Sequence, residues 1–248
     1  MRKQGQISGF ARTLAIVVSL TLPTLVTADR ETERIAMVEA IASDVAATRS
    51  YLGQETLRPE VLQAMAEVPR HAFVPQARRP NAYENRPLPI GHGQTISQPY
   101  IVAIMTDLLN LEPDHRVLEV GTGSGYQAAI LAELVDQVFS IEIIRPLAEA
   151  AIERLRSLGY TNVTTRTGDG YYGWPEAAPF DAIVVTAAAG HVPPSLLDQL
   201  RVGGRLIIPV GSRFTVQQLL LIEKKADGRI VSRSLLPVRF VPLTGGHG

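Results

Sequence analysis

The feature that most constrains the fold of this chain is a short apolar strand that runs directly into three alternate glycines. Residues 116–120 have the composition of a buried strand, and Gly121, Gly123 and Gly125 follow with one residue between each. Glycine lets the backbone turn tightly and approach a ligand without a Cβ in the way. A helix predicted from Tyr126 would present free N–H groups at its N-terminus. The pattern therefore predicts a ligand-binding loop at one edge of a sheet.

Strand and helix patterns alternate from this point towards the C-terminus. This order predicts a parallel sheet with helices on both faces, which is a doubly wound α/β fold. Two further β-rich runs flank the Asp227-Gly228 pair, and they predict a C-terminal β-hairpin. We expect sheet strands at 116–120, 137–143, 162–167, 180–186 and 204–210, hairpin strands at 216–223 and 230–241, and helices at 126–134, 146–158 and 194–200.

An N-terminal helical cap with a long ordered loop is predicted in front of this sheet. Thr56 is the expected N-cap of its second helix, and the prolines between residues 69 and 89 predict an extended stretch. We therefore expect a single domain over 29–248, with the cap and loop in 29–112 and the core in 113–248. From the spacing of apolar residues, cap helices are expected within 31–52, 57–67 and 101–109.

Residues 1–28 have the pattern of a secretory signal peptide. Arg2, Lys3 and Arg12 lie on either side of a polar stretch, the apolar run 14–22 follows, and small Ala28 closes the segment. The run is too short to span a bilayer comfortably, so we expect no stable membrane insertion. A disordered extension, or a start codon placed too far upstream, is the alternative interpretation.

Charge and composition exclude several classes of function. Lysine plus arginine and aspartate plus glutamate number 24 each, so the net charge is zero. A nucleic-acid partner would require a basic footprint, which this balance does not provide. The absence of cysteine excludes disulfides and thiolate chemistry. Because no two of the five histidines have metal-ligand spacing, we expect no metal.

Three acidic residues follow or precede the glycines of the predicted core. Glu119 stands two positions before Gly121, and Glu142 ends the next strand, 17 residues after Gly125 (142 − 125). That offset is near the ~20 residues at which an acid binds ribose hydroxyls, and a carboxylate can accept from both of them. Asp169 follows the third strand and is expected to accept from an adenine amino group. As structural alternatives, Glu142 is a solvated strand end and Asp169 a turn residue.

The run Glu119-Val120-Gly121-Thr122-Gly123-Ser124-Gly125-Tyr126 resembles the first signature of class I S-adenosylmethionine-dependent methyltransferases. Residues 180–186 and 200–206 resemble later strands of the same enzymes. The resemblance implies a Rossmann-like sheet of seven strands whose last strand is antiparallel, and it implies S-adenosylmethionine as methyl donor. The residues expected to bind the donor are Glu119, Gly121, Thr122, Gly123, Ser124, Gly125, Glu142, Asp169 and Gly170.

The run Gly93-Gln94-Thr95-Ile96-Ser97-Gln98-Pro99 resembles the hallmark of the protein-L-isoaspartate O-methyltransferases. Residues 68–70, 73–75, 186–188 and 238–243 also match that family, so the likeness covers about residues 35 to 243. It implies methylation of the free carboxylate of L-isoaspartyl and D-aspartyl residues in damaged proteins and peptides, which initiates repair through a succinimide. We expect a monomer, with Ser97 as the active-site residue and Thr95, Ile96, Ser97, Thr186 and Ala187 contacting the substrate.

Ser97 also has a structural interpretation, because it precedes a predicted helix with Pro99 just inside and is a good N-cap. Both roles are compatible, since a helix N-terminus favours anions. His92 adjoins the same loop and is the one histidine that we would mutate.

Three rival functions remain open at this point. A dinucleotide-dependent oxidoreductase would need a different glycine spacing. A methyltransferase with another substrate would share only the donor-binding half, and a donor-binding module would lack catalysis. The compartment is also open: the family resembled is usually cytoplasmic, where the donor is made, whereas residues 1–28 favour the periplasm or secretion.

Overall fold

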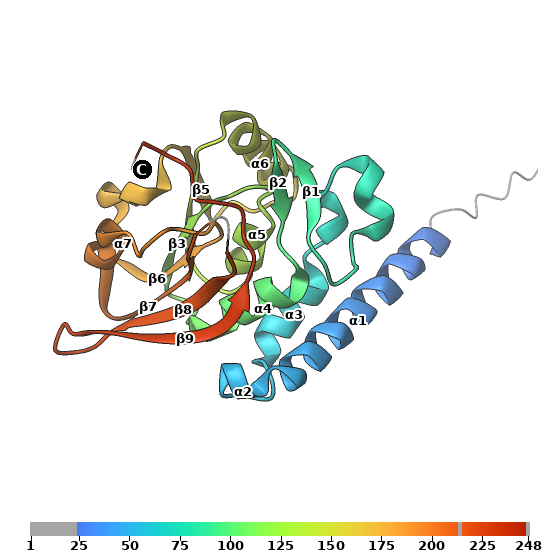
Figure 1. Cartoon of the computed structure of the whole chain (residues 1–248). Helices are drawn as coiled ribbons and strands as arrows, with labels where there is room; N and C mark the ends of the chain where they lie inside the picture. Colours follow the sequence, from blue (N-terminus) through green and yellow to red (C-terminus); the bar gives the residue numbers. More distant parts are fainter. Residues whose placement is uncertain (1–23, 213–214, 247–248) are drawn as a thin grey trace, which may run out of the picture.

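A seven-stranded, mostly parallel sheet forms the centre of the protein (Figure 1), in a computed structural model that describes residues 24–212 and 215–246. The strand order is β5-β4-β3-β6-β7-β8-β9, and only β8 runs against the other strands. The doubly wound α/β fold and the C-terminal hairpin are therefore confirmed. The expectation that the last strand is antiparallel is wrong, because β9 pairs antiparallel with β8 and so runs parallel to the other strands. The strands are β3 (Arg116–Val120), β4 (Gln137–Glu142), β5 (Val163–Thr167), β6 (Phe180–Val185), β7 (Leu200–Val210), β8 (Gln217–Lys224) and β9 (Ile230–Val238).

Both faces of the sheet are buried, which explains why its central strands are apolar throughout. Along β6, Ala182 and Val184 belong to one apolar cluster, whereas Ile183 and Val185 belong to another on the opposite face. The first cluster includes the cap helices and α5 (Tyr126–Ala132); the second includes α7 (Pro194–Gln199). The remaining core helix, α6 (Arg145–Ser157), packs on β4 and β5.

The helical cap lies along one side of the sheet (Figure 1) and shares the first apolar cluster with it. The single domain expected over 29–248 stays a prediction. The predicted N-cap at Thr56 is wrong: α3 has Arg58 as N-cap, because Pro59 occupies the first helical position and Arg58 before it is held extended. The cap helices are α1 (Thr24–Ala47), α2 (Arg49–Leu52), α3 (Pro59–Glu67) and α4 (Pro99–Leu108).

The proline-rich stretch is not simply extended, as the sequence analysis expected. Two 3-10 helices occupy part of this stretch: η1 (Arg70–Phe73) and η2 (Gln76–Asn81). Pro69 and Pro75 are their N-caps, where the fixed backbone angle of proline suits the start of a helical turn. Residues 92 and 93 form the turn of an antiparallel hairpin, β1 (Leu88–Gly91) with β2 (Gln94–Ile96). His92 lies in this turn with a φ of 53°.

The N-terminal prediction falls largely outside the described residues, because residues 1–23 are not described. Helix α1 begins at Thr24 and so extends across the boundary expected at residue 28. Among the residues that the structure covers, no helix is both long enough and apolar enough to cross a membrane.

Candidate active site

A cavity opens at the carboxyl edge of β3, β4 and β6, where parallel α/β sheets bind ligands. Together with the open space at its mouth it comprises about 740 Å³. Its wall combines the glycine loop after β3, the segment 94–97 and the C-terminal residues 241–244. The predicted site residues that line it are Thr95, Ile96, Ser97, Glu119, Gly121, Thr122, Gly123, Ser124, Glu142, Gly170, Thr186 and Ala187.

Glu142 ends β4 with both carboxylate oxygens held by backbone donors. Gly123 donates its N–H to Oε2 and Ile144 donates to Oε1, each over 2.8 Å. These bonds fix the carboxylate in the cavity wall and brace the glycine loop. Each oxygen keeps a second lone pair, so the group can still accept from a ribose diol. The sequence predicted where Glu142 lies, but not that it supports the loop.

Glu119 is fully buried in β3 and has one oxygen without a partner. Ser140 donates its hydroxyl to Oε2, and the Thr122 and Ser140 hydroxyls lie 2.5 Å apart. Within the described residues, Oε1 accepts no hydrogen bond. Burial raises the pKa of Glu119 to about 8, because it disfavours the charged carboxylate. The ionised carboxylate would attract an ammonium group in the cavity, and S-adenosylmethionine carries one on its methionine part.

Ser97 lies between β2 and α4, in the wall that faces the glycine loop. The predicted N-cap role is wrong, because the cap is Gln98 and makes no side-chain cap bond. A residue before proline is disfavoured in helical conformation, so Gln98 stays extended at ψ 134° and the helix begins at Pro99. The Ser97 hydroxyl has no hydrogen bond among the described residues and remains available to a ligand.

Thr186 follows β6 at the floor of the cavity and contacts Gly121. Because of this contact, the expectation that every glycine of the loop makes room for a ligand does not hold for Gly121. The Thr186 hydroxyl donates to the Gly121 carbonyl oxygen over 2.6 Å. A Cβ on Gly121 would collide with the Thr186 oxygen, so this glycine is needed by the protein itself rather than by a ligand. Gly123 differs, since a Cβ there would make ordinary contacts with Ile90 at 3.5 Å and the Gly121 carbonyl oxygen at 4.0 Å. Its φ of 53° and its place in the cavity wall fit the expected approach of a ligand.

Gly125 and Asp169 are the two predicted donor-binding residues outside the cavity lining. A Cβ on Gly125 would lie 3.3 Å from Leu155, so this glycine allows α5 to pack on α6. Asp169 behaves as a turn residue: its Oδ1 accepts from Tyr171 N over 3.0 Å and its Oδ2 from Gly246 N over 3.1 Å. Its predicted contact with adenine stays a prediction.

Several wall residues were missed by sequence reasoning. Tyr126 and Gln127 face the cavity from the start of α5, and Val241 to Thr244 close it from the C-terminus. The tail is held against the residues after β6 by two bonds: Ala188 N donates to Val241 O, and Leu243 N donates to Ala188 O. The match of residues 238–243 to the family was the available signal, but no local pattern placed them at the site.

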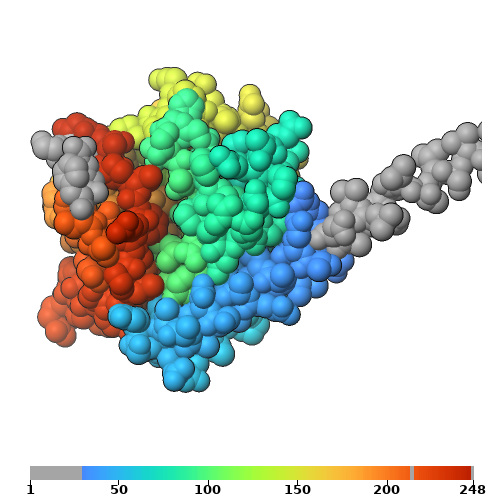
Figure 2. Space-filling model, turned by 45° about the vertical axis from the view of Figure 1, so that its right-hand side comes forward, coloured from blue at the N-terminus to red at the C-terminus, as the bar shows by residue number. Residues whose placement is uncertain are grey.

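A second cavity adjoins the first and shares Thr95, Ser97, Thr186 and Val241 with it. Residues around 87–101 and 237–241 form its walls, and the corresponding green and red surfaces meet in Figure 2. Arg239 is the one ionisable residue in this lining; it is exposed and has no ion pair within the described chain. His92 lines neither cavity. In the described ranges, no group of histidine, aspartate and glutamate side chains could hold a metal ion.

Comparisons with known proteins agree with this geometry. The family model of protein-L-isoaspartate(D-aspartate) O-methyltransferase matches residues 50–248. A protein-L-isoaspartate O-methyltransferase 2 of Syntrophobacter fumaroxidans is 66% identical over 214 residues, which cover 86% of this chain and 87% of the relative. A protein-L-isoaspartate O-methyltransferase 1 of Cupriavidus necator is 56% identical over 237 residues, covering 94% and 92%.

Two solved structures are also similar. One protein-L-isoaspartate O-methyltransferase matches with a TM-score of 0.72 and 32% identity, over 85% of this chain and 67% of the other. A Plasmodium falciparum protein of the same description, in complex with S-adenosyl-L-homocysteine, matches with a TM-score of 0.68 and 26% identity, over 85% and 98%. The family match over residues 50–248, with relatives this similar across most of the chain, leads to one conclusion: the chain belongs to the protein-L-isoaspartate(D-aspartate) O-methyltransferase family.

Proposed function

We propose that this protein transfers the methyl group of S-adenosylmethionine to the free carboxylate of L-isoaspartyl and D-aspartyl residues in damaged proteins and peptides. The observation that carries the proposal is a single cavity with two chemically different walls. Glu119 and Glu142 line one wall, and the free hydroxyl of Ser97 lies in the other. The backbone amide nitrogen of the next residue attacks the methyl ester, which releases methanol and forms a succinimide. Addition of water to the succinimide returns part of the product to normal aspartate.

The donor supplies an electrophilic methyl group on a positively charged sulfur. We expect Glu142 to accept from the ribose hydroxyls, and we expect the ionised Glu119 to attract the ammonium group of the donor. The glycine loop brings the backbone close to the ligand at Gly123. These contacts hold the donor without touching the methyl group, which must stay open towards Ser97.

The substrate carboxylate needs orientation rather than activation. Its reference pKa is near ~4, so it is already ionised at neutral pH and no strong base is required. Hydroxyls of Ser97 and Thr95 donate to it and align one oxygen with the methyl carbon, which can contribute about 7–11 kcal/mol in favourable cases. Ile96, Val241 and Leu243 exclude water nearby. Because the reaction neutralises two opposite charges, this apolar surrounding favours the transition state over the charged reactants.

The test uses purified protein and two peptides that differ only in isoaspartyl or normal aspartyl linkage. With labelled S-adenosylmethionine, we expect base-labile methyl ester on the isoaspartyl peptide alone. A D-aspartyl peptide is expected to be methylated more slowly. Donor binding without label on any of these peptides would leave a methyltransferase with another substrate, or a binding module without catalysis. Binding of a nicotinamide cofactor would instead favour an oxidoreductase.

We also propose that the protein acts as a monomer on protein and peptide substrates, because residues of one chain line both cavities. Light scattering at the concentration of the assay tests this. A dimer whose dissociation abolishes activity would contradict it.

A further proposal concerns the compartment. The basic start, short apolar run and small closing residue of segment 1–28 support export to the periplasm or beyond, with cleavage near Ala28. Cell fractionation followed by N-terminal sequencing tests it. A full-length protein recovered from the cytoplasm would overturn the proposal and would agree with the place where the methyl donor is made.

A further inference from the structure

Arg70 is a buried cation that no step of the proposed reaction uses. Its side chain is 0% exposed at the start of η1, and it forms no ion pair within the described residues. Burying an unpaired charge costs free energy, so such an arginine is unusual in a protein core. Burial lowers the pKa of Arg70 to about 10, which leaves the guanidinium charged at neutral pH. The structure must therefore compensate this charge without a carboxylate.

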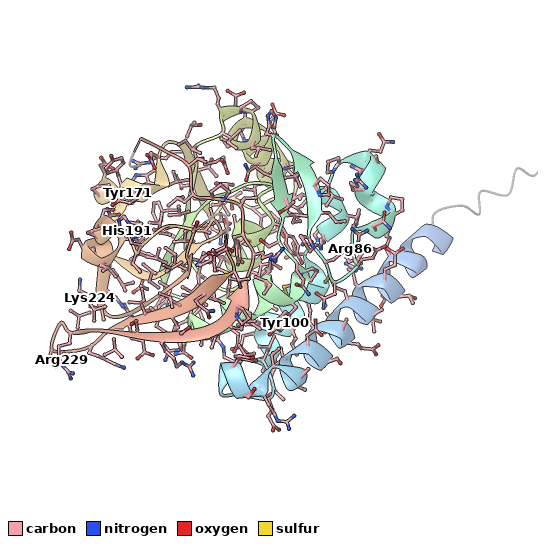
Figure 3. All side chains as sticks on the ribbon, in the orientation of Figure 1. Arg86, Tyr100, Tyr171, His191, Lys224 and Arg229 are labelled. Atoms are coloured by element: carbon pink, nitrogen blue, oxygen red, sulfur yellow. The ribbon has the colours of Figure 1, made fainter. Side chains whose placement is uncertain are left out.

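Backbone carbonyls and one aromatic face provide part of the compensation, while Nη1 has no hydrogen-bond partner among the described residues. The Nε atom donates to Ala82 O over 2.8 Å, and Nη2 donates to Ser97 O over 2.7 Å. A longer contact of 3.5 Å joins Nη2 to Arg86 O. The guanidinium carbon also lies 4.7 Å from the centre of the Tyr126 ring. Figure 3 labels Arg86 beside β1, in the segment that this side chain holds.

Two of these partners, Ser97 and Tyr126, line the active-site cavity on opposite walls. Ser97 is in the wall assigned to the substrate, and Tyr126 begins α5 behind the donor-binding glycines. Phe73, one helical turn after Arg70, contacts the same tyrosine edge-on, with ring centres 5.5 Å apart. Two side chains of η1, Arg70 and Phe73, therefore pack against Tyr126, and Arg70 also donates a hydrogen bond to the Ser97 carbonyl.

We propose that Arg70 is a positioning residue that sets the Ser97 segment against the donor-binding helix. A bond to the Ser97 carbonyl fixes the peptide plane after Ser97 and, with it, the direction in which the hydroxyl leaves the backbone. Only a planar guanidinium can donate in its plane to carbonyls and stack on a ring at once; a lysine ammonium offers a point charge. This inference rests on the proposed methyl transfer, and it adds a residue that touches neither donor nor substrate.

The first experiment compares Arg70→Lys and Arg70→Met with a matched pair at another cap arginine. Arg58 is suitable because it is partly buried, bonds Asp107 and the Leu111 carbonyl, and lies away from the active-site cavity. For Arg70→Lys we expect kcat on the isoaspartyl peptide to fall about 10- to 100-fold, since a misplacement of about 1 Å can cost that much. The dissociation constant of the donor should change less than about threefold, because the guanidinium lies against Tyr126 and not against a residue expected to bind the donor.

Arg58→Lys and Arg58→Met separate this role from a merely structural one. They should lower the melting temperature while the folded protein keeps its kcat. An Arg70→Lys variant that keeps kcat within a factor of about two, or that loses kcat only in proportion to unfolded protein, would overturn the proposal. If Arg70→Met does not fold, the lysine variant still decides between these outcomes.

Hydrogen exchange tests the positioning role of Arg70 without an activity measurement. In Arg70→Lys, we expect amide exchange in residues 94–98 to rise by about tenfold or more, while exchange in β6 stays unchanged. The Arg58 variants should leave residues 94–98 as they are. Unchanged exchange there in Arg70→Lys would contradict the positioning role even if wild-type protein failed to methylate the isoaspartyl peptide. That failure on its own would concern only the proposed function.

Discussion

The two walls of the active-site cavity differ in charge and in how their polar atoms are held. The donor wall carries Glu119 and Glu142, and their oxygens are bonded to nearby backbone or hydroxyl groups with one oxygen left over. The substrate wall around Ser97 has no carboxylate, and Arg239 is the one ionisable residue in the adjoining cavity. The difference suits the two ligands, because the donor brings positive charge and the substrate brings a carboxylate.

The walls also differ in how they are assembled. The donor wall comes from consecutive strand–loop–helix units, so each polar group lies at a strand end that sets its direction. The substrate wall combines a short hairpin, the residues after β6 and the C-terminal tail. Mutations on the donor wall should therefore act on donor binding, and mutations on the substrate wall on turnover or peptide binding.

The largest effect is expected for Glu142→Ala. The change removes the acceptor for two ribose hydroxyls and frees the N–H groups of Gly123 and Ile144. Hydrogen bonds to a charged group contribute about 1.5–3 kcal/mol each, so donor affinity should fall at least about 100-fold. Titration calorimetry with S-adenosylhomocysteine measures this. An affinity within a factor of about five of wild type would mean that the ribose is bound elsewhere.

Ser97→Ala tests the substrate wall, where a mutation should lower turnover without changing donor binding. It removes one donor to the substrate carboxylate, and we expect kcat to fall about 10- to 50-fold with the donor affinity unchanged. Initial rates at saturating donor and peptide, together with calorimetry, separate the two effects. A parallel loss of donor affinity would show that the two walls do not act independently.

A smaller, pH-dependent effect is expected from Glu119. The donor ammonium favours the ionised carboxylate, whose pKa burial raises to about 8 in the free protein. Binding at pH 7 should therefore release about one proton, and affinity should rise about tenfold between pH 6 and 7. Calorimetry in two buffers of different ionisation enthalpy measures the release. Glu119→Gln should abolish it, and an unchanged release in that variant would assign the proton to another group.

The same group has a predictable effect on stability without the donor. A carboxyl whose pKa is raised above its usual value near 4.5 binds more protons in the folded state than in the unfolded state. Its contribution is therefore present at acid pH and is lost as pH rises through about 8. Donor-free Glu119→Gln should be less sensitive than wild type over this window, as thermal unfolding at pH 5 and pH 8 would show.

The smallest effect is expected for Arg239→Ala. The side chain is exposed, so its main effect should be to attract anionic peptides. Its removal should therefore raise KM for the isoaspartyl peptide about threefold at low salt. Added salt should shrink this difference because it screens exposed charges. Arg229, at the tip of the β8–β9 hairpin (Figure 3) and paired with Asp227, is the matched control. Equal changes for Arg229→Ala would indicate a general effect of net charge.

Most of the sheet could be predicted from the sequence, whereas the cap could be predicted less well. The predicted positions of β3 to β6 agree with the structure to within about one residue at each end, whereas β7 begins at Leu200, about four residues before its predicted start. In the cap, proline was interpreted as a sign of extended chain between residues 69 and 89. It instead starts η1 and η2, because the same fixed φ suits both conformations and only packing decides between them.

The sequence by itself determined the alternation of strands and helices, the glycine loop and the position of Glu142 at the end of β4. Side-chain periodicity and strand-end geometry act within about ten residues, so they are visible locally. The tertiary structure alone decided that Ser97 faces the donor wall, that Val241 to Thr244 close the cavity and that Arg70 is buried against Tyr126. These contacts join segments far apart in the chain, and their free energy depends on packing that no local pattern encodes.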